Sequence, residues 1–430
     1  MNDRHTGHSR KWMKLDNAAK IYPVAMKGGW MSIFRLSAEL NEKVDPEILQ
    51  RALIRTAKRF PSFTQRLRRG FFWYYLEQII AEPVISEDVM NPCARMNFKK
   101  NNGYMFRVRY HENRIALEVF HVLADGTGGL CFLKTLLAEY ISLRYGENVP
   151  RSDTILDCNK TALKAEYEDS FLKYARKAAL LPKEENAYHV SGTREENGFM
   201  HVTTAFISVK ALSEKAKLYG ATITEYLICH LIESIVEIQK SEIGKKHFLP
   251  VKVCVPVNMR KFYPSKTVRN FAQFVNVGIS PRFGEYTFQE TLSIVRHQMG
   301  LFATEKQLNA RMSMNVNAER HKLMRIAPLF IKNPAILIAF IRNGDRNSSV
   351  TLSNLGIVSL PDEMKKHIEH FDFMLGALST NPIVVGCISY NDLLCINITR
   401  SIKESFFERE FLTRLVKSGI HVKVESNQRF

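Results

Sequence analysis

The spacing of hydrophobic and polar positions changes between residues 114 and 146, and the change predicts a strand followed by a helix. From 115 to 121 the odd-numbered positions carry Ile, Leu, Val and His on one face, as in a strand that ends at His121. From 130 to 145 the apolar residues recur at helical spacing, and Gly146 is a typical helix end. The sequence Asp-Gly-Thr-Gly-Gly lies between these segments. We therefore expect a strand, a glycine-rich loop and a helix in succession.

The same patterns predict further elements. A helix is expected from Asp45-Pro46-Glu47 to about Phe60, because an acidic cap and an early proline open it and Pro61 ends it. Other strands are expected at 30–40, 71–77, 104–110, 201–208, 251–256, 274–279, 350–355 and 393–399, and other helices at 209–219, 224–239, 287–304 and 403–417. This mixture predicts an α/β (α+β) protein whose two halves have a similar order of elements.

The longest apolar run covers residues 326–341. Lys332, Asn333 and Pro334 interrupt it, so that it falls short of the roughly 20 apolar residues of a membrane-spanning helix. We expect a pair of buried helices here and no transmembrane segment.

A length of 430 residues exceeds one ordinary core and suits two domains. The composition becomes polar and charged from about 151 to 197, which is typical of a crossover between lobes. We place the boundary near residue 190, giving lobes of residues 1–190 and 191–430.

The seven cysteines are odd in number and form no Cys-x-x-Cys pair. This pattern argues against a disulfide framework and a zinc knuckle, and it suits a reducing compartment. Residues 1–14 are basic but are not followed by the apolar run of a secretory signal. We expect a cytoplasmic protein.

The net charge of +18 suits three kinds of anionic partner: nucleic acid, a membrane surface or a phosphate-bearing substrate. The basic residues form only short, separated runs and match no nucleic-acid-binding pattern, so specific nucleic-acid binding is not expected. A weak contact with an anionic membrane surface is compatible with this charge.

The segment around His121 carries the candidate chemistry. A histidine at a strand end can accept a proton near neutral pH. Asp125 can tie the turn to an arginine, and Gly126 removes a side chain where the backbone must bend or approach a substrate. The alternative is a structural histidine, since His-x-x-x-Asp alone is a short match.

Other catalytic patterns are absent from the sequence. It contains no Gly-x-Ser-x-Gly elbow, P-loop or His-Glu-x-x-His helix, and the glycines after Asp125 lack dinucleotide-binding spacing. His367 and His370 could share a helical face, but their polar surroundings favour a solvated surface. We predict no metal site.

The segment from Phe120 to Gly129 resembles the His-x-x-x-Asp-Gly signature of the CoA-dependent, chloramphenicol-acetyltransferase-like acyltransferase superfamily. Three further stretches resemble its members in the same order along the chain. They are Leu15-Asp16-Asn17-Ala18-Ala19-Lys20, then Pro256-Val-Asn258-Met-Arg260 with Arg269-Asn270-Phe271, and then Thr351-Leu-Ser353-Asn354-Leu-Gly356. The resemblance spans roughly residues 15–420.

This resemblance implies two lobes, each a mixed sheet flanked by helices, that form a pseudo-dimer with a tunnel between them. It implies that His121 is a general base, that Asp125 pairs with Arg260 to hold the loop with Gly126, and that Ser353 or Asn354 lies near the oxyanion. Asn270 belongs to the supporting stretch.

The reaction that the resemblance implies is direct acyl transfer, without an acyl-enzyme, to the hydroxyl of a small-molecule alcohol. The donor would be acyl-CoA or acyl-phosphopantetheine on an acyl carrier protein, used as a co-substrate, and no cofactor would be bound permanently.

Two departures narrow the resemblance. Residue 120 is Phe, so the doubled histidine of peptide-forming condensation domains is missing, and the plant motif Asp-Phe-Gly-Trp-Gly is absent as well. Both favour a stand-alone alcohol O-acyltransferase. Two alternatives stay open: an amine acceptor that gives an amide, and a catalytically silent protein that binds an acyl chain or lipid. For Arg260, Asn270, Ser353 and Asn354, purely structural roles also stay open.

Overall fold

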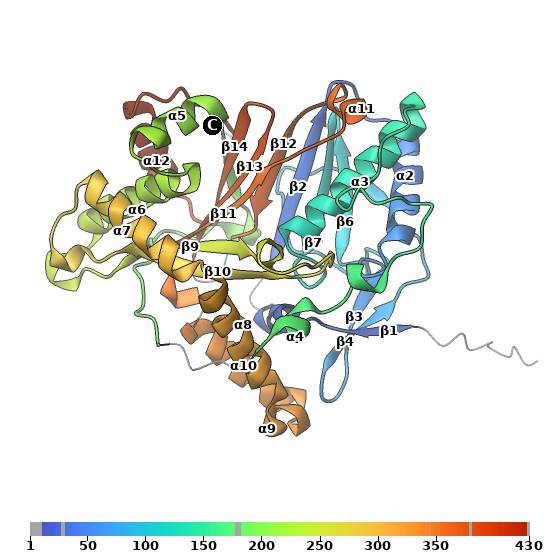
Figure 1. Ribbon diagram of the computed structural model, residues 1–430, viewed down its shortest axis with the longest axis horizontal. Coiled ribbons are helices and arrows are strands. Elements are labelled where there is room, and N and C mark those ends of the chain that lie inside the picture. Colours follow the sequence, from blue (N-terminus) through green and yellow to red (C-terminus); the bar gives the residue numbers. More distant parts are fainter. Residues whose placement is uncertain (1–10, 27–30, 177–181, 344, 378–380, 428–430) are drawn as a thin grey trace, which may run out of the picture.

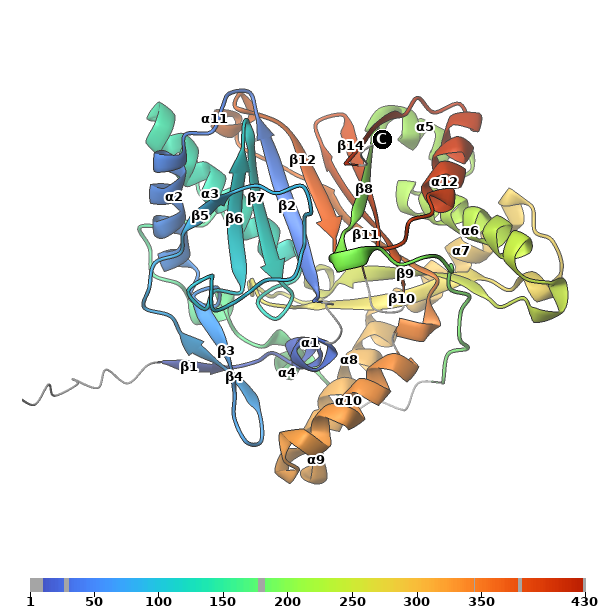
Figure 2. The same ribbon diagram turned by 180° about the vertical axis from the view of Figure 1, so that it is seen from behind.

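The computed structural model describes residues 11–26, 31–176, 182–343, 345–377 and 381–427. Residues 1–10, on which part of the expectation about an export signal rests, lie outside this range, as does Trp30. Within the described residues the strands form three sheets, two of which build separate lobes flanked by helices (Figures 1 and 2). The predicted mixed α/β fold with two lobes is confirmed.

The sheet of the first lobe has five strands in the order β12-β2-β7-β6-β5 among the described residues. It is mixed, because β5 runs parallel to β6 while the other neighbours are antiparallel. Its strands are β2 (Ile33–Leu40), β5 (Ile85–Glu87), β6 (Phe106–His111), β7 (Arg114–Phe120) and β12 (Ile368–Leu375).

The sheet of the second lobe has the order β10-β9-β11-β13-β14-β8-β15. It is also mixed, since β11 runs parallel to both β9 and β13. Its strands are β8 (His201–Ser208), β9 (Val251–Asn258), β10 (Ala272–Ile279), β11 (Val350–Ile357), β13 (Ile383–Tyr390), β14 (Leu393–Arg400) and β15 (Lys423–Ser426).

Helices cover the outer faces of both sheets, and α8, α9 and α10 extend to one side of the molecule (Figure 1). The first lobe carries α2 (Pro46–Arg59), α3 (Gly126–Tyr145) and α11 (Asp362–Lys365), and the second carries α5 (Val209–Leu218), α6 (Ile223–Glu242), α7 (Phe288–Phe302) and α12 (Phe406–Lys417). The remaining helices are α1 (Tyr22–Ala25), α4 (Ser170–Tyr174), α8 (Glu305–Arg320), α9 (Lys322–Ile326) and α10 (Leu329–Asn343).

The start of α2 follows its sequence closely. Asp45 caps the helix by accepting hydrogen bonds from the backbone N–H groups of Glu47 at 2.9 Å and Ile48 at 3.1 Å, and Pro46 is the first helical residue. The buried face of α2 includes Leu49 and Leu53. The predicted helix is therefore confirmed, with its end at Arg59.

The third sheet is a small one in the order β1-β4-β3. Its strands are β1 (Trp12–Lys14), β3 (Gln65–Arg69) and β4 (Tyr74–Gln78). The strand predicted at 71–77 is thus displaced, because residues 71–73 form the tip of the β3–β4 hairpin.

The second half of the chain contributes a strand to the first lobe. β12 pairs with β2 antiparallel, so that Phe373 lies opposite Leu36. β12 also passes close to β13, where a Cβ on Gly386 would lie 2.3 Å from the carbonyl oxygen of Phe373. In addition, Phe171 and Tyr188 pack into the core of the second lobe. Each core therefore includes residues from both sides of position 190. The domain boundary near residue 190 stays a prediction.

The apolar run 326–341 departs from expectation. The run includes most of α10, which agrees with the prediction of helical structure. However, the side chains of Ile326, Phe330 and Ile338 are each more than half exposed. The expectation of burial was wrong, because apolar content alone does not tell which elements pack against a helix. None of the helices in the described ranges is long and apolar enough to cross a membrane.

Candidate active site

His121 follows the last residue of β7 and is held by backbone and aromatic contacts. Its N–H donates to the carbonyl oxygen of Ser32 at 2.9 Å. The ring of Tyr22 stacks on the imidazole with centroids 4.9 Å apart, and Phe34 meets it in a T-shaped arrangement with centroids 5.1 Å apart. The half-buried side chain is therefore held by Phe34 of the first lobe's core and by Tyr22 of the N-terminal segment.

Asn270, which precedes β10, determines the protonation pattern of the imidazole. Its Nδ2 donates to the carbonyl oxygen of His121 at 2.9 Å and to Oδ2 of Asp16 at 3.3 Å. Both partners are acceptors, so the orientation of the amide is fixed and its Oδ1 faces Nδ1 of His121 at 3.2 Å. Nδ1 must then carry the proton, which leaves Nε2 as the unprotonated nitrogen.

The same surroundings set the pKa of His121. Burial lowers this pKa below the usual 6.5, and the hydrogen bond to Asn270 together with the negative charges of Asp125 and Asp16 opposes the shift. The ring is accordingly neutral at neutral pH, as a proton acceptor must be.

Asp125 caps α3 and connects the two lobes. Its Oδ1 accepts from the N–H of Gly128 at 2.9 Å. Its Oδ2 accepts from the N–H of Phe271 and from Nη1 of Arg260, both at 2.8 Å. All of these bonds hold backbone or loop, and none reaches the imidazole.

Arg260 lies in a short 3-10 turn, η5 (Met259–Lys261), and its donors are occupied. Besides Asp125, Nε and Nη2 donate to the carbonyl oxygen of Thr267 at 3.0 and 2.8 Å, and Nη2 also donates to that of Arg269 at 2.6 Å. The planar guanidinium thus organises the 267–271 turn and joins it to the loop that follows His121.

Glycines allow the loop to approach other segments closely. A Cβ on Gly128 would lie 1.9 Å from the carbonyl oxygen of Val268 in the second lobe, and one on Gly126 would lie 2.7 Å from Leu355 of β11. The backbone itself therefore forms the contact between lobes at this point.

Ser353 and Asn354 lie on β11, and their side chains have no hydrogen bond to His121 among the described residues. Nδ2 of Asn354 donates to Oγ1 of Thr224 at 3.2 Å, and its Oδ1 accepts from the N–H of Gly356 at 2.8 Å. The amide therefore holds the start of α6 and a bulge in its own strand. Hydrogen bonds link His121, Asp125, Arg260 and Asn270 directly or through neighbouring residues, whereas those of the Asn354 side chain lead to Thr224 and Gly356.

Asp16 and Tyr22 are site residues for which the sequence suggested no role. The buried Asp16 accepts from Asn270 and from the N–H of Ala19 at 2.8 Å, and its Oδ2 lies 3.4 Å from Nη2 of Arg269. Burial raises the pKa of Asp16, although Arg269 opposes the shift. The stretch around Asp16 was noticed only as part of a resemblance, and no signal marked Tyr22.

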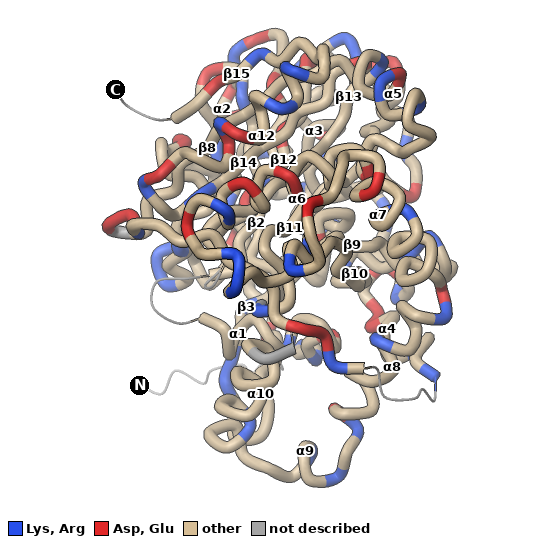
Figure 3. Tube along the Cα trace, turned by 90° about the vertical axis from the view of Figure 1, so that its left-hand side faces the viewer, with Lys and Arg blue, Asp and Glu red and all other residues tan. Residues whose placement is uncertain are grey.

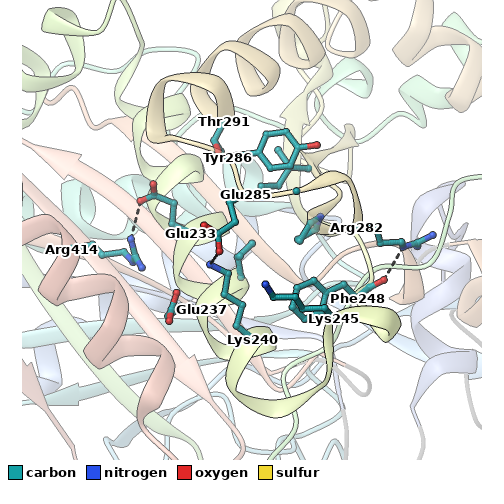
Figure 4. Close-up of a pocket in the computed structure, with 14 residues that line it drawn as sticks. Glu233, Glu237, Lys240, Lys245, Phe248, Arg282, Glu285, Tyr286, Thr291 and Arg414 are labelled. Atoms are coloured by element: carbon teal, nitrogen blue, oxygen red, sulfur yellow. Dashed lines mark hydrogen bonds and ion pairs between the residues drawn. The ribbon is translucent and has the colours of Figure 1, made fainter.

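A cavity that does not include His121 lies between α6, α7 and α12 (Figure 4). Its volume is about 320 Å³. Its charges are largely paired with one another: Lys240 with Glu285 at 2.9 Å and Arg414 with Glu233 at 3.2 Å. A further lining cation, Arg282, pairs with Glu185.

The possible histidine pair at 367 and 370 is not on a helix. The ring of His367 stacks on Tyr145 at 4.0 Å, and His370 lies in β12, 3.5 Å from Asp372. No cluster of three or more His, Cys, Asp or Glu suited to a metal ion occurs in the described part of the chain.

Comparison with known proteins gives one family match and several structural neighbours. The family model for alcohol acetyltransferase matches residues 171–416, a range that includes Arg260 and Asn270 but not His121. No curated protein sequence matches the chain.

Solved structures share the fold at low sequence identity. Trichothecene 15-O-acetyltransferase TRI3 from Fusarium sporotrichioides is 11% identical, with a TM-score of 0.61 and coverage of 96% of each chain. TRI101 from F. sporotrichioides, complexed with coenzyme A and T-2, is 10% identical, with a TM-score of 0.64 and coverage of 97% of this chain and 100% of that chain. The first condensation domain of the CDA synthetase is 12% identical, with a TM-score of 0.57 and coverage of 95% of each chain.

Proposed function

Because the chain belongs to the alcohol acetyltransferase family, we propose that it transfers an acyl group from acyl-CoA to the hydroxyl of a small-molecule alcohol, with His121 as the general base. The observation that carries the proposal is the bond between Asn270 and Nδ1 of His121, which leaves Nε2 able to accept a proton. The fold neighbour TRI101 from F. sporotrichioides has been solved with coenzyme A and T-2, and TRI101 from F. graminearum with coenzyme A and deoxynivalenol, which supports coenzyme A as the carrier of the donor and a small molecule as the acceptor.

In the proposed reaction, Nε2 of His121 takes the proton from the acceptor hydroxyl while the oxygen attacks the thioester carbonyl. Collapse of the tetrahedral intermediate breaks the C–S bond, and the imidazolium returns the proton to the leaving thiolate. The products are an ester and free CoA, and no acyl-enzyme forms. A positioned base contributes about 10²–10⁴ in rate.

The other site residues act through His121 and its loop in this proposal. Asp125 and Arg260 hold the loop, and Gly126 lets it pack closely against Leu355 of β11. Ser353 or Asn354 stays the proposed support for the oxyanion. Of the two, Ser353 suits the role better, because the amide of Asn354 already bonds Thr224 and Gly356. Backbone N–H groups could also donate to the oxyanion.

The proposed acyl donor and the proposed cellular location rest on the net charge and on the cysteines. The chain's charge of +18 suits the phosphates of CoA and would also suit an acidic acyl carrier protein, and we place the substrates in a tunnel between the lobes. The cysteines are all free thiols, which suits a cytoplasmic enzyme.

The test is a thiol-release assay with the purified protein, a panel of acyl-CoAs, and matched alcohols and amines. We expect release that depends on an alcohol, and a fall of about 10²–10⁴ in kcat/KM for His121→Ala. The control is His421→Ala, which changes an exposed histidine and should retain the parent activity. Equal turnover by His121→Ala and the parent would refute the assignment of the base, and faster transfer to amines would refute the alcohol.

A further inference from the structure

α9 and the β3–β4 hairpin extend to the same end of the molecule (Figures 1 and 2), and this end carries exposed apolar side chains. Between 37% and 67% of each side chain is exposed, which is unusual for so many large apolar residues in one place. This end surface consists of Trp12, Phe71, Phe72, Trp73, Leu323, Ile326, Phe330 and Ile331.

The hairpin and the helices form one continuous surface. The N–H of Leu329 donates to the carbonyl oxygen of Phe71 at 2.9 Å. Nζ of Lys332 donates to the carbonyl oxygen of Phe72 at 2.9 Å and lies 3.3 Å from the ring centroid of Trp73. The aromatic tip is therefore fixed against the start of α10, so that both present their apolar side chains together.

Cations surround these apolar side chains. Arg69 is exposed beside the hairpin tip, and Arg320, Lys322 and Arg325 are exposed on the helical side. The sequence from 320 to 343 contains no Asp or Glu, and Figure 3 shows only blue among the coloured residues of α9 and α10.

Nearby carboxylates are already neutralised. Glu77 pairs with Arg66 and with Arg68, and Glu319 pairs with Lys20. The end surface therefore has an excess of positive charge, and its natural complement is an anionic surface.

A pocket opens on this surface between the hairpin and the end of α8. Its volume is about 850 Å³, and its lining includes Trp73, Tyr75, Leu172 and Arg325. Leu15 also lines it and directly precedes Asp16, which contacts Asn270 of the site around His121. An apolar molecule collected at this surface would therefore be close to the N-terminal segment of that site.

We propose that the end surface docks onto a lipid bilayer with acidic headgroups. Aromatic and aliphatic side chains would enter the interface, while Arg69, Lys322 and Arg325 would meet headgroup phosphates. A second copy of this chain fits less well, because the same cations would face one another. Since no described helix is suited to span a membrane, the contact would be peripheral and reversible.

The experiment is co-sedimentation of the full chain with vesicles of phosphatidylcholine alone or with 30 mol% phosphatidylglycerol added. We expect at least about tenfold stronger binding to the anionic vesicles, because each cation near a charged surface contributes. The binding should weaken as salt rises. Equal binding to both vesicles, or binding to neither, would overturn the proposal.

Charge-reversal variants test which cations matter. The double variant Lys322→Glu/Arg325→Glu should bind anionic vesicles about 30-fold more weakly or worse. The control Lys245→Glu/Lys246→Glu makes the same change in net charge on η4 (Lys245–His247) of the second lobe and should bind like the parent. If both variants lost binding equally, only the overall charge would be responsible, and the assignment of this surface would be wrong.

Apolar variants test insertion. Phe71→Ala/Phe330→Ala should lower vesicle binding at least about tenfold, whereas Leu218→Ala/Phe283→Ala, which alters equally exposed side chains elsewhere, should not. All variants should keep the parent melting temperature and the parent thiol release with a water-miscible alcohol. Concentration-dependent dimers that Phe71→Ala/Phe330→Ala abolishes, without vesicle binding by the parent, would instead assign the surface to self-association.

Discussion

Asn270 contacts His121 at two points: its Oδ1 lies 3.2 Å from Nδ1 of the ring, and its Nδ2 donates to the backbone carbonyl oxygen at 2.9 Å. One amide therefore sets both the position of the histidine and the nitrogen that carries its proton. Asn270 belongs to the second lobe and His121 to the first, so the geometry of His121 depends on how the lobes meet.

Replacement of this amide should change the pH profile. The hydrogen bond that Nδ1–H of His121 donates to Oδ1 of Asn270 opposes the lowering of the His121 pKa, so Asn270→Ala should move the acidic limb of kcat/KM to lower pH. Loss of one hydrogen bond should also reduce kcat by about 3- to 10-fold. Asn309→Ala removes another buried amide, which bonds Tyr263 at 2.7 Å, and should leave the profile unchanged. A parent-like profile for Asn270→Ala would count against the positioning role.

In the parent enzyme, the pH profile of kcat/KM should have its acidic midpoint below 6.5, the usual pKa of histidine. His121 must be neutral to accept a proton, and burial lowers its pKa below 6.5. Protonation inactivates the base, so kcat/KM should rise with pH through a midpoint below 6.5 and be level at neutral pH. Steady-state rates from pH 4.5 to 8 would measure it. A midpoint above 6.5 would show that another group limits the reaction or that the ring is less desolvated.

Asp125→Asn should lower stability as well as activity. The carboxylate accepts from Gly128, Phe271 and Arg260, and an amide cannot accept from all three, so that the guanidinium of Arg260, whose side chain is only 13% exposed, loses its charge partner. Breaking such a pair costs about 3–5 kcal/mol. Chemical denaturation would measure this loss. Asp362→Asn, which breaks an exposed pair with Lys365, is the control and should leave stability unchanged. Lost activity with unchanged stability would point to direct chemistry by Asp125.

Gly128→Ala should disrupt the contact between the lobes. The added Cβ would lie 1.9 Å from the carbonyl oxygen of Val268, which cannot yield as a flexible side chain can. We expect a lower melting temperature and loss of most activity. Gly300→Ala is the matched control, because this exposed helical glycine has no atom within 4 Å of the new Cβ, and the change should stabilise α7 by about 0.5–1 kcal/mol. If Gly128→Ala kept the melting temperature and activity of the control, the close approach of Gly128 to Val268 would be unimportant for stability and function.

The order of strand, loop and helix around His121 could be predicted from sequence because it depends on local periodicity. The pairing of Asp125 with Arg260 was available only through resemblance, since the residues are 135 positions apart. The contacts of Asp16 and Tyr22 with the site depend on how distant segments pack, and no pattern in their own neighbourhoods encodes that.

The same limit applies to the fold. The spacing of apolar residues located most helices, but it gave no sign that β12 leaves its own half of the chain or that α10 keeps Phe330 and Ile338 exposed. Local pattern reports which face of an element is apolar, whereas the partner of that face is a property of the whole molecule.

The pairing of β12 with β2 has a consequence for biosynthesis. β2 is made early, but the strand that completes its sheet comes only at residues 368–375, so the backbone groups along one edge of β2 have no strand partner while most of the second half is translated. Domains usually fold in order as they leave the ribosome. Here the sheet of the first lobe cannot be completed until β12 has been made. The open edge of β2 is therefore a site on the nascent chain that needs protection from aggregation.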